Sequence, residues 1–403
     1  MTKTVTEENS EVANQENKER AERLELKRAL IKEENEIAYE EAMKMLSDTY
    51  VVINIGGKTT IYNKIRTSNN MMSVNEAREY LANLNYKIKI IDDYEQVSTI
   101  RVSIFKDWFL DEKTLRYESL TFDPEATYGP CGKEWNTWRG WKYEPKEGDC
   151  SLYLDHIKNN ICMGKEELYS YVLDYMAQII QEPKRKIFHS LAIKGQKGTG
   201  KSIFVQMFME LFGEAAVEIS DSEVLTNQFN SILADRLLVY GDEAFWSGDR
   251  KNRGNLKNLI SSDTLRVTFK FKDTITIPNY IRFIFTTNED WAAPVEKGER
   301  RWVTLRCGEA RINDRAYFGK MKSQMRNGGY NALMKLLAER DISKRDWSKV
   351  PETEASKEDM AFTTIGDNVV AESSTNVRAE WSLAQSSIDT RTVPFHHMPS
   401  SSR

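Results

Sequence analysis

The stretch LAIKGQKGTGKSIFVQ, residues 191–206, decides the fold. Its central part, residues 195–202, fits GxxxxGK[ST] at every fixed position, with an apolar run before it and an apolar-periodic segment after it, as a strand and a helix should have. The glycines of such a loop let backbone N–H groups point at phosphate oxygens, while Lys201 reaches the β- and γ-phosphates and Ser202 can bind Mg²⁺. Loops of this kind serve kinases, GTPases, transporters and motors, so the loop predicts a nucleotide ligand and not yet a function. The predicted nucleotide-binding residues are Gly195, Gln196, Lys197, Gly198, Thr199, Gly200, Lys201 and Ser202.

The chain as a whole excludes several classes of protein. Its 403 residues can hold two or three domains, and no stretch approaches the ~20 uninterrupted apolar residues of a membrane-spanning helix. The N-terminus, MTKTVTEENSEVANQENKER, is polar and unlike a signal peptide, so we expect a cytoplasmic protein with no membrane partner. The four cysteines lack CxxC spacing and predict neither a disulfide framework nor a zinc site. The formal net charge of −4 does not decide for or against nucleic acid, because a narrow basic channel can lie in an acidic protein.

A second strand, with two carboxylates, follows the loop. In ADRLLVYGDEAFW, residues 234–246, a buried-strand pattern ends in Asp242 and Glu243, at the strand end where ligands bind in open α/β sheets. We expect Asp242 to orient the metal and Glu243 to act as the general base on the attacking water. The alternative is an ordinary acidic pair in a strand-end loop. A nucleotide kinase does not need a water-activating glutamate, so the pair favours a hydrolase.

The segment VTFKFKDTITI, residues 267–277, predicts a hairpin with lysines near its tip. Its apolar residues alternate strictly with Thr268, Lys270 and Lys272 before Asp273 and a returning strand. Lysines on such a strand can simply discourage edge-to-edge pairing of sheets. The functional alternative is a loop that contacts a phosphate backbone.

Two polar features lie in the last part of the predicted ATPase domain. The strand in YIRFIFTTNE, residues 280–289, ends in Asn288, whose amide can hold the attacking water or sense the γ-phosphate. GERRWVTLR, residues 298–306, places Arg300 and Arg301 directly before a strand. Polar strand ends and paired arginines are common on protein surfaces. However, an arginine aimed across a subunit boundary can neutralise transition-state charge in trans.

Composition divides the chain into six segments. The first is dense in Glu, Lys and Arg and predicts a solvated helix, either a surface arm or an oligomerisation helix. Short alternating runs then predict a small α+β domain, in which Trp135, Trp138 and Trp141 either stack on bases or pack a loop-rich core. The predicted segments are 1–46 (charged arm), 47–160 (accessory α+β domain), 161–185 (helical connector), 186–305 (ATPase domain), 306–360 (C-terminal helical segment) and 361–403 (Ser/Thr-rich tail).

The order of these parts resembles the superfamily 3 helicases, the AAA+ replication motors of small DNA viruses, phages and plasmids. The resemblance spans about residues 186–305, and the phrases WNTWRGW, GTGKS and GERRW look most like phage and prophage primase-helicase proteins. It extends more loosely from about residue 50 to 355. The resemblance implies a P-loop NTPase core of the AAA+ type, with the small accessory domain and flanking helices around it. We find no primase-polymerase domain upstream, so we expect no priming activity and a separate primase-polymerase as a partner.

Carried over by position, the resemblance gives the Walker A role to Lys201 and Ser202. It gives the Walker B role to Asp242 and Glu243, and the sensor 1 role to Asn288. ATP and Mg²⁺ are the implied cofactors.

The remaining roles concern DNA and the neighbouring subunit. The resemblance assigns Lys270 and Lys272 to a DNA-contacting hairpin and the arginine finger to Arg301, with Arg300 as second choice. The sequence therefore predicts an ATP-dependent DNA helicase of phage or mobile-element replication that translocates on single-stranded DNA as a homo-oligomeric ring, expected to be a hexamer. The alternatives are an AAA+ ATPase that remodels or loads replication proteins, and a replication scaffold that binds ATP structurally.

Overall fold

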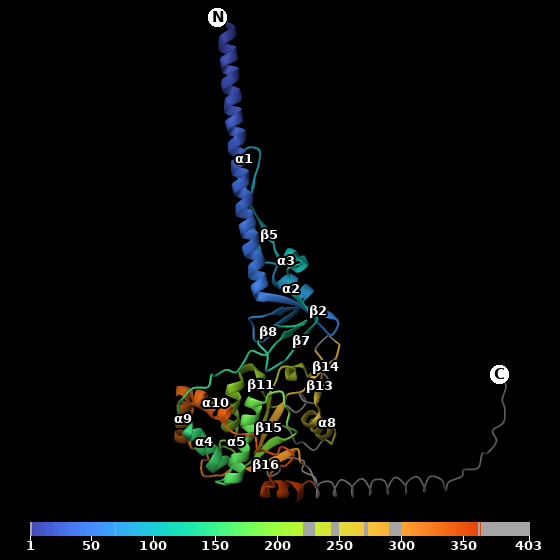
Figure 1. Cartoon of the computed structure of the whole chain (residues 1–403), viewed down its shortest axis with the longest axis vertical. Coiled ribbons are helices and arrows are strands. Elements are labelled where there is room, and N and C mark those ends of the chain that lie inside the picture. Colours follow the sequence, from blue (N-terminus) through green and yellow to red (C-terminus); the bar gives the residue numbers. More distant parts are fainter. Residues whose placement is uncertain are drawn as a thin grey trace, which may run out of the picture. The chain divides into compact units, whose positions relative to one another are not determined.

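The computed structural model describes residues 2–68, 70–220, 230–242, 250–269, 273–289, 300–361 and 363. The chain forms two compact units (Figure 1). Unit 1 consists of Met1–Arg139 and Arg266–Ile277, and unit 2 consists of Gly140–Leu265 and Pro278–Arg403. The predicted domain boundaries do not coincide with these units, since residues 140–185 belong to unit 2 and residues 266–277 belong to unit 1.

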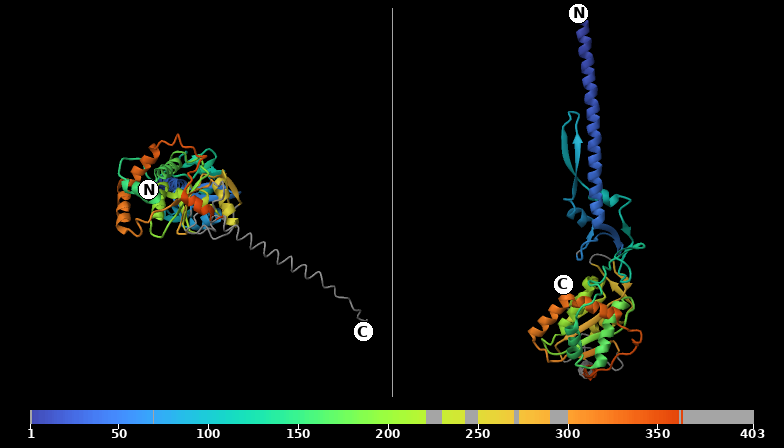
Figure 2. Two further views of the ribbon diagram at one scale, coloured as in Figure 1. Left: turned by 90° about the horizontal axis from the view of Figure 1, so that it is seen from below. Right: turned by 60° about the vertical axis from the view of Figure 1, so that its left-hand side comes forward.

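Unit 2 is built on a five-stranded parallel sheet with helices packed around it (Figure 2). The strand order is β11-β12-β15-β10-β16, so the strand before the glycine-rich loop lies inside the sheet. Most residues of its three inner strands are buried, as expected of parallel strands covered on both faces. The strands are β10 (Ser190–Lys194), β11 (Ala216–Ile219), β12 (Leu238–Asp242), β15 (Arg282–Thr287) and β16 (Trp302–Arg306).

The helices of unit 2 follow the apolar periodicity of the sequence. The longest described one, α5, has a continuous buried face and ends two residues before Pro183, as the sequence predicts. The helices are α4 (Ser151–Asp155), a π-helix (His156–Ile161), α5 (Glu166–Gln181), α6 (Lys201–Met209), a 3₁₀-helix (Glu210–Ala215), a 3₁₀ turn (Ser231–Leu233), α8 (Arg250–Ser261), α9 (Arg315–Gln324), a second π-helix (Met325–Gly329), α10 (Tyr330–Glu339) and a helical segment at residues 354–361.

A buried arginine joins the sheet to the end of α5. Arg282, the first residue of β15, is 1% exposed, and its guanidinium donates to the carbonyl oxygens of Pro183 (2.6 Å) and Glu182 (3.0 Å) and to Oε1 of Gln178 (3.2 Å). Burial lowers the pKa of this guanidinium to about 10. Arg282 thus supplies donors to backbone carbonyl groups of the turn that follows α5 and to one side chain of the helix.

Unit 1 contains a four-stranded sheet of order β3-β2-β1-β6 and three smaller sheets or hairpins. The run YVVINI of β1 is buried on both faces: Tyr50 and Val52 face one core with Trp108, while Val51 and Ile53 face the other. The elements are α1 (Thr2–Thr49), β1 (Tyr50–Ile55), β2 (Lys58–Asn63), β3 (Met71–Ser73), α2 (Val74–Tyr80), β4 (Asn85–Ile91), β5 (Val97–Ser103), α3 (Phe105–Leu110), β6 (Arg116–Tyr117), β7 (Ser119–Thr121), β8 (Gly129–Cys131), β9 (Glu134–Asn136) and the paired strands β13 (Thr264–Val267) and β14 (Ile275–Pro278), of which residues 266–277 belong to unit 1.

Two of the three tryptophans of the accessory segment, Trp135 and Trp138, support packing rather than base stacking. Trp135 is 4% exposed and belongs to the second core of unit 1, and Trp138 is 6% exposed and contacts Phe122 edge to face. Rings buried to this degree are not available to stack on a nucleic-acid base. Within the described residues, no helix is both long and apolar enough to cross a membrane.

Candidate functional site

The glycine-rich loop, residues 195–202, lies at the carboxyl edge of the unit 2 sheet, between the end of β10 and the start of α6. Two of its glycines adopt backbone conformations that L-residues rarely take, with φ of 83° at Gly198 and 93° at Gly200. A Cβ at Gly198 would lie 2.4 Å from Oδ1 of Asn313, and one at Gly200 would lie 2.7 Å from Cε1 of His156. The loop therefore requires glycine at both positions. No side chain caps the N-terminus of α6, a helix end suited to bind an anion.

The structure brings Lys201 and Asn288 together. Asn288 directly follows β15, the neighbour of β10 in the sheet. The Lys201 ammonium is 5% exposed and donates to the carbonyl oxygens of Gly195 (2.7 Å) and Gln196 (2.9 Å) and to Oδ1 of Asn288 (2.9 Å). An ammonium has three N–H donors, and each of these three oxygens can accept one of them. A phosphate that binds Lys201 would compete with these acceptors.

A buried hydroxyl lies close to both predicted metal ligands. Tyr240 of β12 is hydrogen-bonded to the hydroxyl of Thr286 (2.8 Å), and the side chains of Ser202 and Asp242 lie near enough to influence the pKa of its phenol. The hydroxyl of Thr286 also donates to Oδ1 of Asp242 (2.5 Å). Burial raises the pKa of Tyr240, which keeps the phenol protonated.

These contacts fit the requirements of Mg²⁺, which takes one or two protein oxygens and fills its shell with phosphate oxygens and water. Ser202 supplies a hydroxyl and Asp242 a carboxylate, and both lie near the Tyr240 hydroxyl. Among the described residues, no cluster of three or more His, Cys, Asp or Glu offers an alternative metal site. Ser202 and Asp242 are therefore the pair that could hold the metal beside a bound nucleotide.

Two side chains of the first π-helix form hydrogen bonds with the backbone of the glycine-rich loop. The amide Nδ2 of Asn160 donates to the carbonyl oxygen of Thr199 (2.7 Å) and contacts Sγ of Cys307 (3.3 Å). Nε2 of His156 lies 3.2 Å from the carbonyl oxygen of Gly200, so it donates there. Burial lowers the pKa of His156 to about 4, so the ring is neutral near pH 7. Irregular helices of this kind often occur at functional sites.

A buried ion pair lies directly before the loop. Lys194, the last residue of β10, is fully buried and contacts Oδ1 of Asp359 (2.8 Å) and Oε2 of Glu358 (2.8 Å). Asp359 is itself fully buried, and its helical segment is joined to β16 by a hydrogen bond from Thr353 to the carbonyl oxygen of Thr304 (2.6 Å). The C-terminal segment thus fixes the strand end from which the loop departs.

The arginines lie at the opposite edge of the sheet from the loop. β10 and β16 are parallel, with Ser190 paired to Trp302, so Arg301 precedes β16 at the amino edge. Nε of Arg301 donates to Oγ of Ser261 at the end of α8 (2.6 Å), and Arg300 is exposed. Neither arginine therefore lies at the same sheet edge as the glycine-rich loop of its own chain. The predicted residues Glu243, Lys270 and Lys272 lie outside the described residues.

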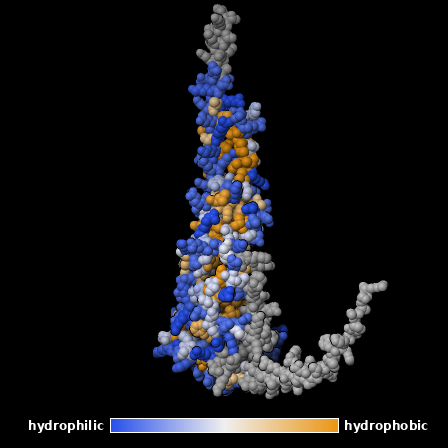
Figure 3. Space-filling model, turned by 90° about the vertical axis from the view of Figure 1, so that its right-hand side faces the viewer, coloured by the Kyte–Doolittle hydropathy of each residue, from blue (hydrophilic) through white to orange (hydrophobic). Residues whose placement is uncertain are grey.

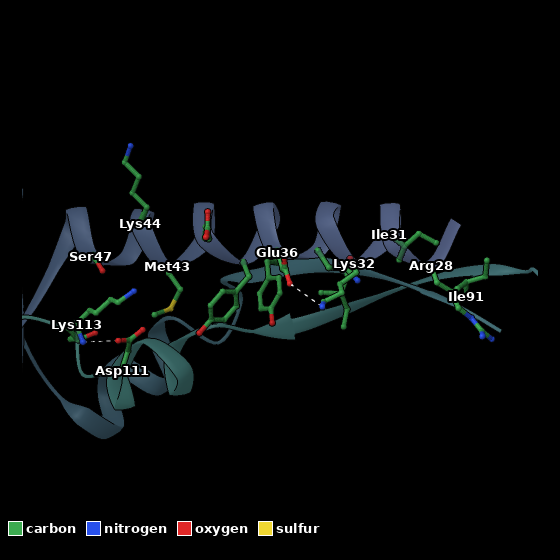
Figure 4. A pocket seen from close by; sticks show the side chains of 16 residues that line it. Arg28, Ile31, Lys32, Glu36, Met43, Lys44, Ser47, Ile91, Asp111 and Lys113 are labelled. Atoms are coloured by element: carbon green, nitrogen blue, oxygen red, sulfur yellow. Dashed lines mark hydrogen bonds and ion pairs between the residues drawn. The ribbon is translucent and has the colours of Figure 1, made fainter. Parts of the chain in front are cut away.

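Unit 1 has a groove of about 730 Å³ between α1 and the β4–β5 hairpin, on a face where hydrophobic side chains gather (Figures 3 and 4). The side chain of Asn35 in α1 forms two hydrogen bonds with the backbone of Lys89 in β4 (2.7 and 2.8 Å). The groove is lined by apolar residues such as Ile31, Met43 and Ile88, together with charged residues of both signs. It contains none of the predicted site residues and no glycine-rich loop, so residues 195–202 remain the better candidate for a nucleotide.

Comparisons with known proteins place the chain near a phage replication enzyme. By its fold the chain is a mixed α/β protein with a parallel five-stranded sheet, which confirms the predicted fold class to that extent. A family of unknown function (DUF5906) matches residues 193–301. The chain is 28% identical over 197 residues to the DNA primase-polymerase of Nitratiruptor phage NrS-1, and this match covers 47% of the chain and 27% of the phage protein.

The solved structures point to one part of that phage protein. An apo structure of the NrS-1 C-terminal region resembles the chain with a TM-score of 0.58 at 18% identity, covering 79% of this chain and 73% of that one. Another apo structure of the same region has a TM-score of 0.54 at 20% identity, covering 69% and 70%. The chain is therefore related to the C-terminal region of a phage DNA primase-polymerase and spans about a quarter of the whole phage protein.

Proposed function

We propose that this protein is an ATP-dependent DNA helicase that translocates on single-stranded DNA as a homo-oligomeric ring during phage or mobile-element replication. The observation that carries the proposal is the gathering of Lys201, Asn288, Ser202 and Asp242 at the carboxyl edge of one parallel sheet. The relationship to the C-terminal region of a phage DNA primase-polymerase supports a role in replication.

Each residue then has a part in nucleotide hydrolysis. The loop amides and the α6 N-terminus bind phosphate oxygens, and Lys201 exchanges its bond to Asn288 for a phosphate contact. Mg²⁺ would be held by Ser202 and Asp242 and would neutralise charge on the phosphates. Glu243, next to Asp242 in the sequence, is assigned to orient and deprotonate water, which the freed amide of Asn288 helps to position.

The position of Arg301 suits a role at the site of a neighbouring subunit. It lies at the amino edge of the sheet, whereas the loop lies at the carboxyl edge, so an arginine finger from this segment would act in trans. A finger in trans can raise the rate of hydrolysis by ~10³-fold or more.

Two assays with single-stranded and forked DNA test the proposal. The parent chain should hydrolyse ATP faster with single-stranded DNA and should unwind forks, and Lys201→Ala should do neither. ATPase activity that single-stranded DNA does not stimulate would instead support a protein remodeller or loader. Absence of ATP turnover in the parent would leave only a scaffold that binds ATP.

Mixing two inactive variants tests the finger and the ring together. Arg301→Ala subunits have intact loops without a finger, and Lys201→Ala subunits have intact fingers that face inactive loops. Mixed before assembly, they should form some interfaces with both groups intact and regain ATPase activity. If mixed rings demonstrably form without any gain, Arg301 acts within its own subunit, or Arg300 is the finger, or neither has this role.

A further inference from the structure

Three polar side chains form a row on one face of the unit 2 sheet, near its carboxyl edge. Tyr240 and Asp242 are two residues apart in β12, so their side chains point to the same face. Thr286 of β15 is paired with Asp242 in the parallel register of the two strands, which places its side chain beside theirs. Tyr240 is 0% exposed and Thr286 is 3% exposed, so both hydroxyl groups depend on protein partners.

The hydrogen bonds along this row have one direction. The hydroxyl of Thr286 has a single hydrogen, which it donates to Oδ1 of Asp242 (2.5 Å). The bond between Tyr240 and Thr286 (2.8 Å) must therefore use the hydrogen of the phenol, so Tyr240 donates and Thr286 accepts. A hydroxyl that accepts one hydrogen bond is polarised and donates more strongly in the next. The row thus ends on one defined oxygen of the Asp242 carboxylate.

The second predicted metal ligand reaches the same face from a helix. α6 packs on β12 and β15, and its Ser202 lies near the Tyr240 phenol. The terminal torsion of an aspartate side chain is broad, so the carboxylate plane needs an outside contact to fix it. Only some of its orientations direct an oxygen to a metal ion that Ser202 also binds. The bond from Thr286 selects one orientation of Asp242.

We infer that Thr286 and Tyr240 are positioning residues for the metal ion of the nucleotide. Thr286 holds Oδ1 of Asp242 and leaves Oδ2 as the oxygen for Mg²⁺, and Tyr240 holds Thr286 in place. This inference rests on the proposed function and adds to it two residues that act through Asp242. Hydrogen-bond partners of metal ligands typically contribute 10- to 100-fold to metal affinity or activity.

A pair of substitutions at Thr286 tests its role without any turnover of ATP. Binding of a fluorescent, non-hydrolysable ATP analogue is measured in EDTA and over a series of Mg²⁺ concentrations. Thr286→Val keeps the shape of the side chain and loses the hydroxyl, whereas Thr286→Ser keeps the hydroxyl. Thr286→Val should need roughly 10- to 100-fold more Mg²⁺ for half of the metal-dependent gain in affinity, and should bind like the parent in EDTA. Thr286→Ser should match the parent in both conditions.

Two results would overturn the role of Thr286. One is a parental Mg²⁺ requirement of the Thr286→Val variant. The other is a loss of affinity that is equally large in EDTA and in Mg²⁺, because a side chain that only stabilises the sheet affects both conditions alike.

Tyr240→Phe gives a second test that leaves Thr286 itself intact. It should raise the Mg²⁺ requirement as Thr286→Val does, because Thr286 then loses the donor that holds it. Tyr175 provides the control: it is also fully buried in unit 2, and its hydroxyl donates to the carbonyl oxygen of Phe283 (3.1 Å). Tyr175→Phe should keep the parental Mg²⁺ requirement at a temperature where thermal unfolding shows every variant to be folded. Equal requirements of the two Phe variants would overturn the role of Tyr240.

The outcomes separate this inference from the proposed function. A parent chain whose affinity for the analogue does not depend on Mg²⁺ would contradict the metal site of the proposed function, and so would an Asp242→Asn variant that keeps the parental dependence. A parent that responds to Mg²⁺ through Asp242, beside Thr286→Val and Tyr240→Phe variants with the same response, would contradict only the positioning role.

Discussion

Replacing Asn160 by alanine should weaken nucleotide binding without any direct contact to the nucleotide. The substitution removes the donor that fixes the carbonyl oxygen of Thr199, in a position where water does not replace it because Asn160 is 4% exposed. Among the described residues, the oxygen then keeps only the weak S–H donor of Cys307 (3.7 Å), and a buried carbonyl without a full hydrogen bond costs about 1–3 kcal/mol. If the loop shifts to give the Thr199 carbonyl another partner, this free energy is lost from ATP binding. Each 1.4 kcal/mol that is lost lowers the affinity tenfold. We therefore expect the dissociation constant for ATP to rise by ~5-fold to ~150-fold.

Asn159 provides a matched control on the same π-helix. Its side chain is exposed and donates to Oδ1 of Asp155 (2.6 Å), away from the loop. Titration with a fluorescent ATP analogue should give parental affinity for Asn159→Ala and reduced affinity for Asn160→Ala, with thermal unfolding measured in parallel. If both variants bind the analogue equally well, or if Asn160→Ala loses only stability, the loop does not depend on this contact.

Three further predictions follow from the site and its supports. Lys201→Ala should abolish ATP hydrolysis, and Glu243→Gln should leave ATP bound but unhydrolysed; parental turnover by Glu243→Gln would show that another group is the base. Arg282→Met should lower the free energy of unfolding by about 3 kcal/mol or more, because it leaves several buried carbonyls without a donor, and chemical denaturation measures this loss. The pKa of both His156 and His189 is lowered from 6.5 to about 4 by burial, so the unfolded chain binds protons that the folded chain does not between these values. Stability should therefore fall as the pH drops from 6.5 to 4, by up to roughly 3 kcal/mol per histidine, and His156→Gln should reduce the part of this fall that the two histidines cause by about half, because His189 still titrates.

Local patterns in the sequence predicted the strands whose ends carry residues of the candidate site. Apolar runs that stop at Lys194, Asp242 and Thr287 predicted three strands, and the structure places their ends at one edge of the sheet. Parallel strands have this property whatever their order, but the contact of Lys201 with Asn288 also needs β15 beside β10, which the sequence did not predict. A hairpin was also predicted at residues 267–277; the structure pairs β13 with β14 there, but of the alternating residues 267–272 only Val267 belongs to β13, and residues 270–272 lie outside the described residues.

The supports of the loop could not be predicted in this way. Asn160 lies in a segment assigned to the accessory domain, because the Pro- and Gly-rich stretch before it conceals the boundary between the units. Lys194 is separated from Asp359 by most of unit 2, and a lysine at a strand end looks exposed until its buried partner is found. Tyr240 lies in an apolar run that predicts a buried strand, and this pattern predicts that the ring is buried but not that its hydroxyl forms a hydrogen bond. Each of these contacts depends on tertiary structure and leaves no periodic signal in the sequence.

In the proposed function, nucleotide binding would change the contacts of Lys201 more than those of the parts that support the loop. The loop backbone is fixed by Asn160, and the strand before it by Lys194, so these parts have little freedom to respond. The bond from Lys201 to Asn288 is different, because it joins two side-chain groups from separate segments and competes directly with a phosphate. Asn288 directly follows β15, and three residues separate β15 from β14, the returning strand of the hairpin. In the proposed function, exchange of this bond for a phosphate contact would therefore act on the strand that continues from the hairpin, whereas the same exchange at a loop carbonyl would remain within the loop.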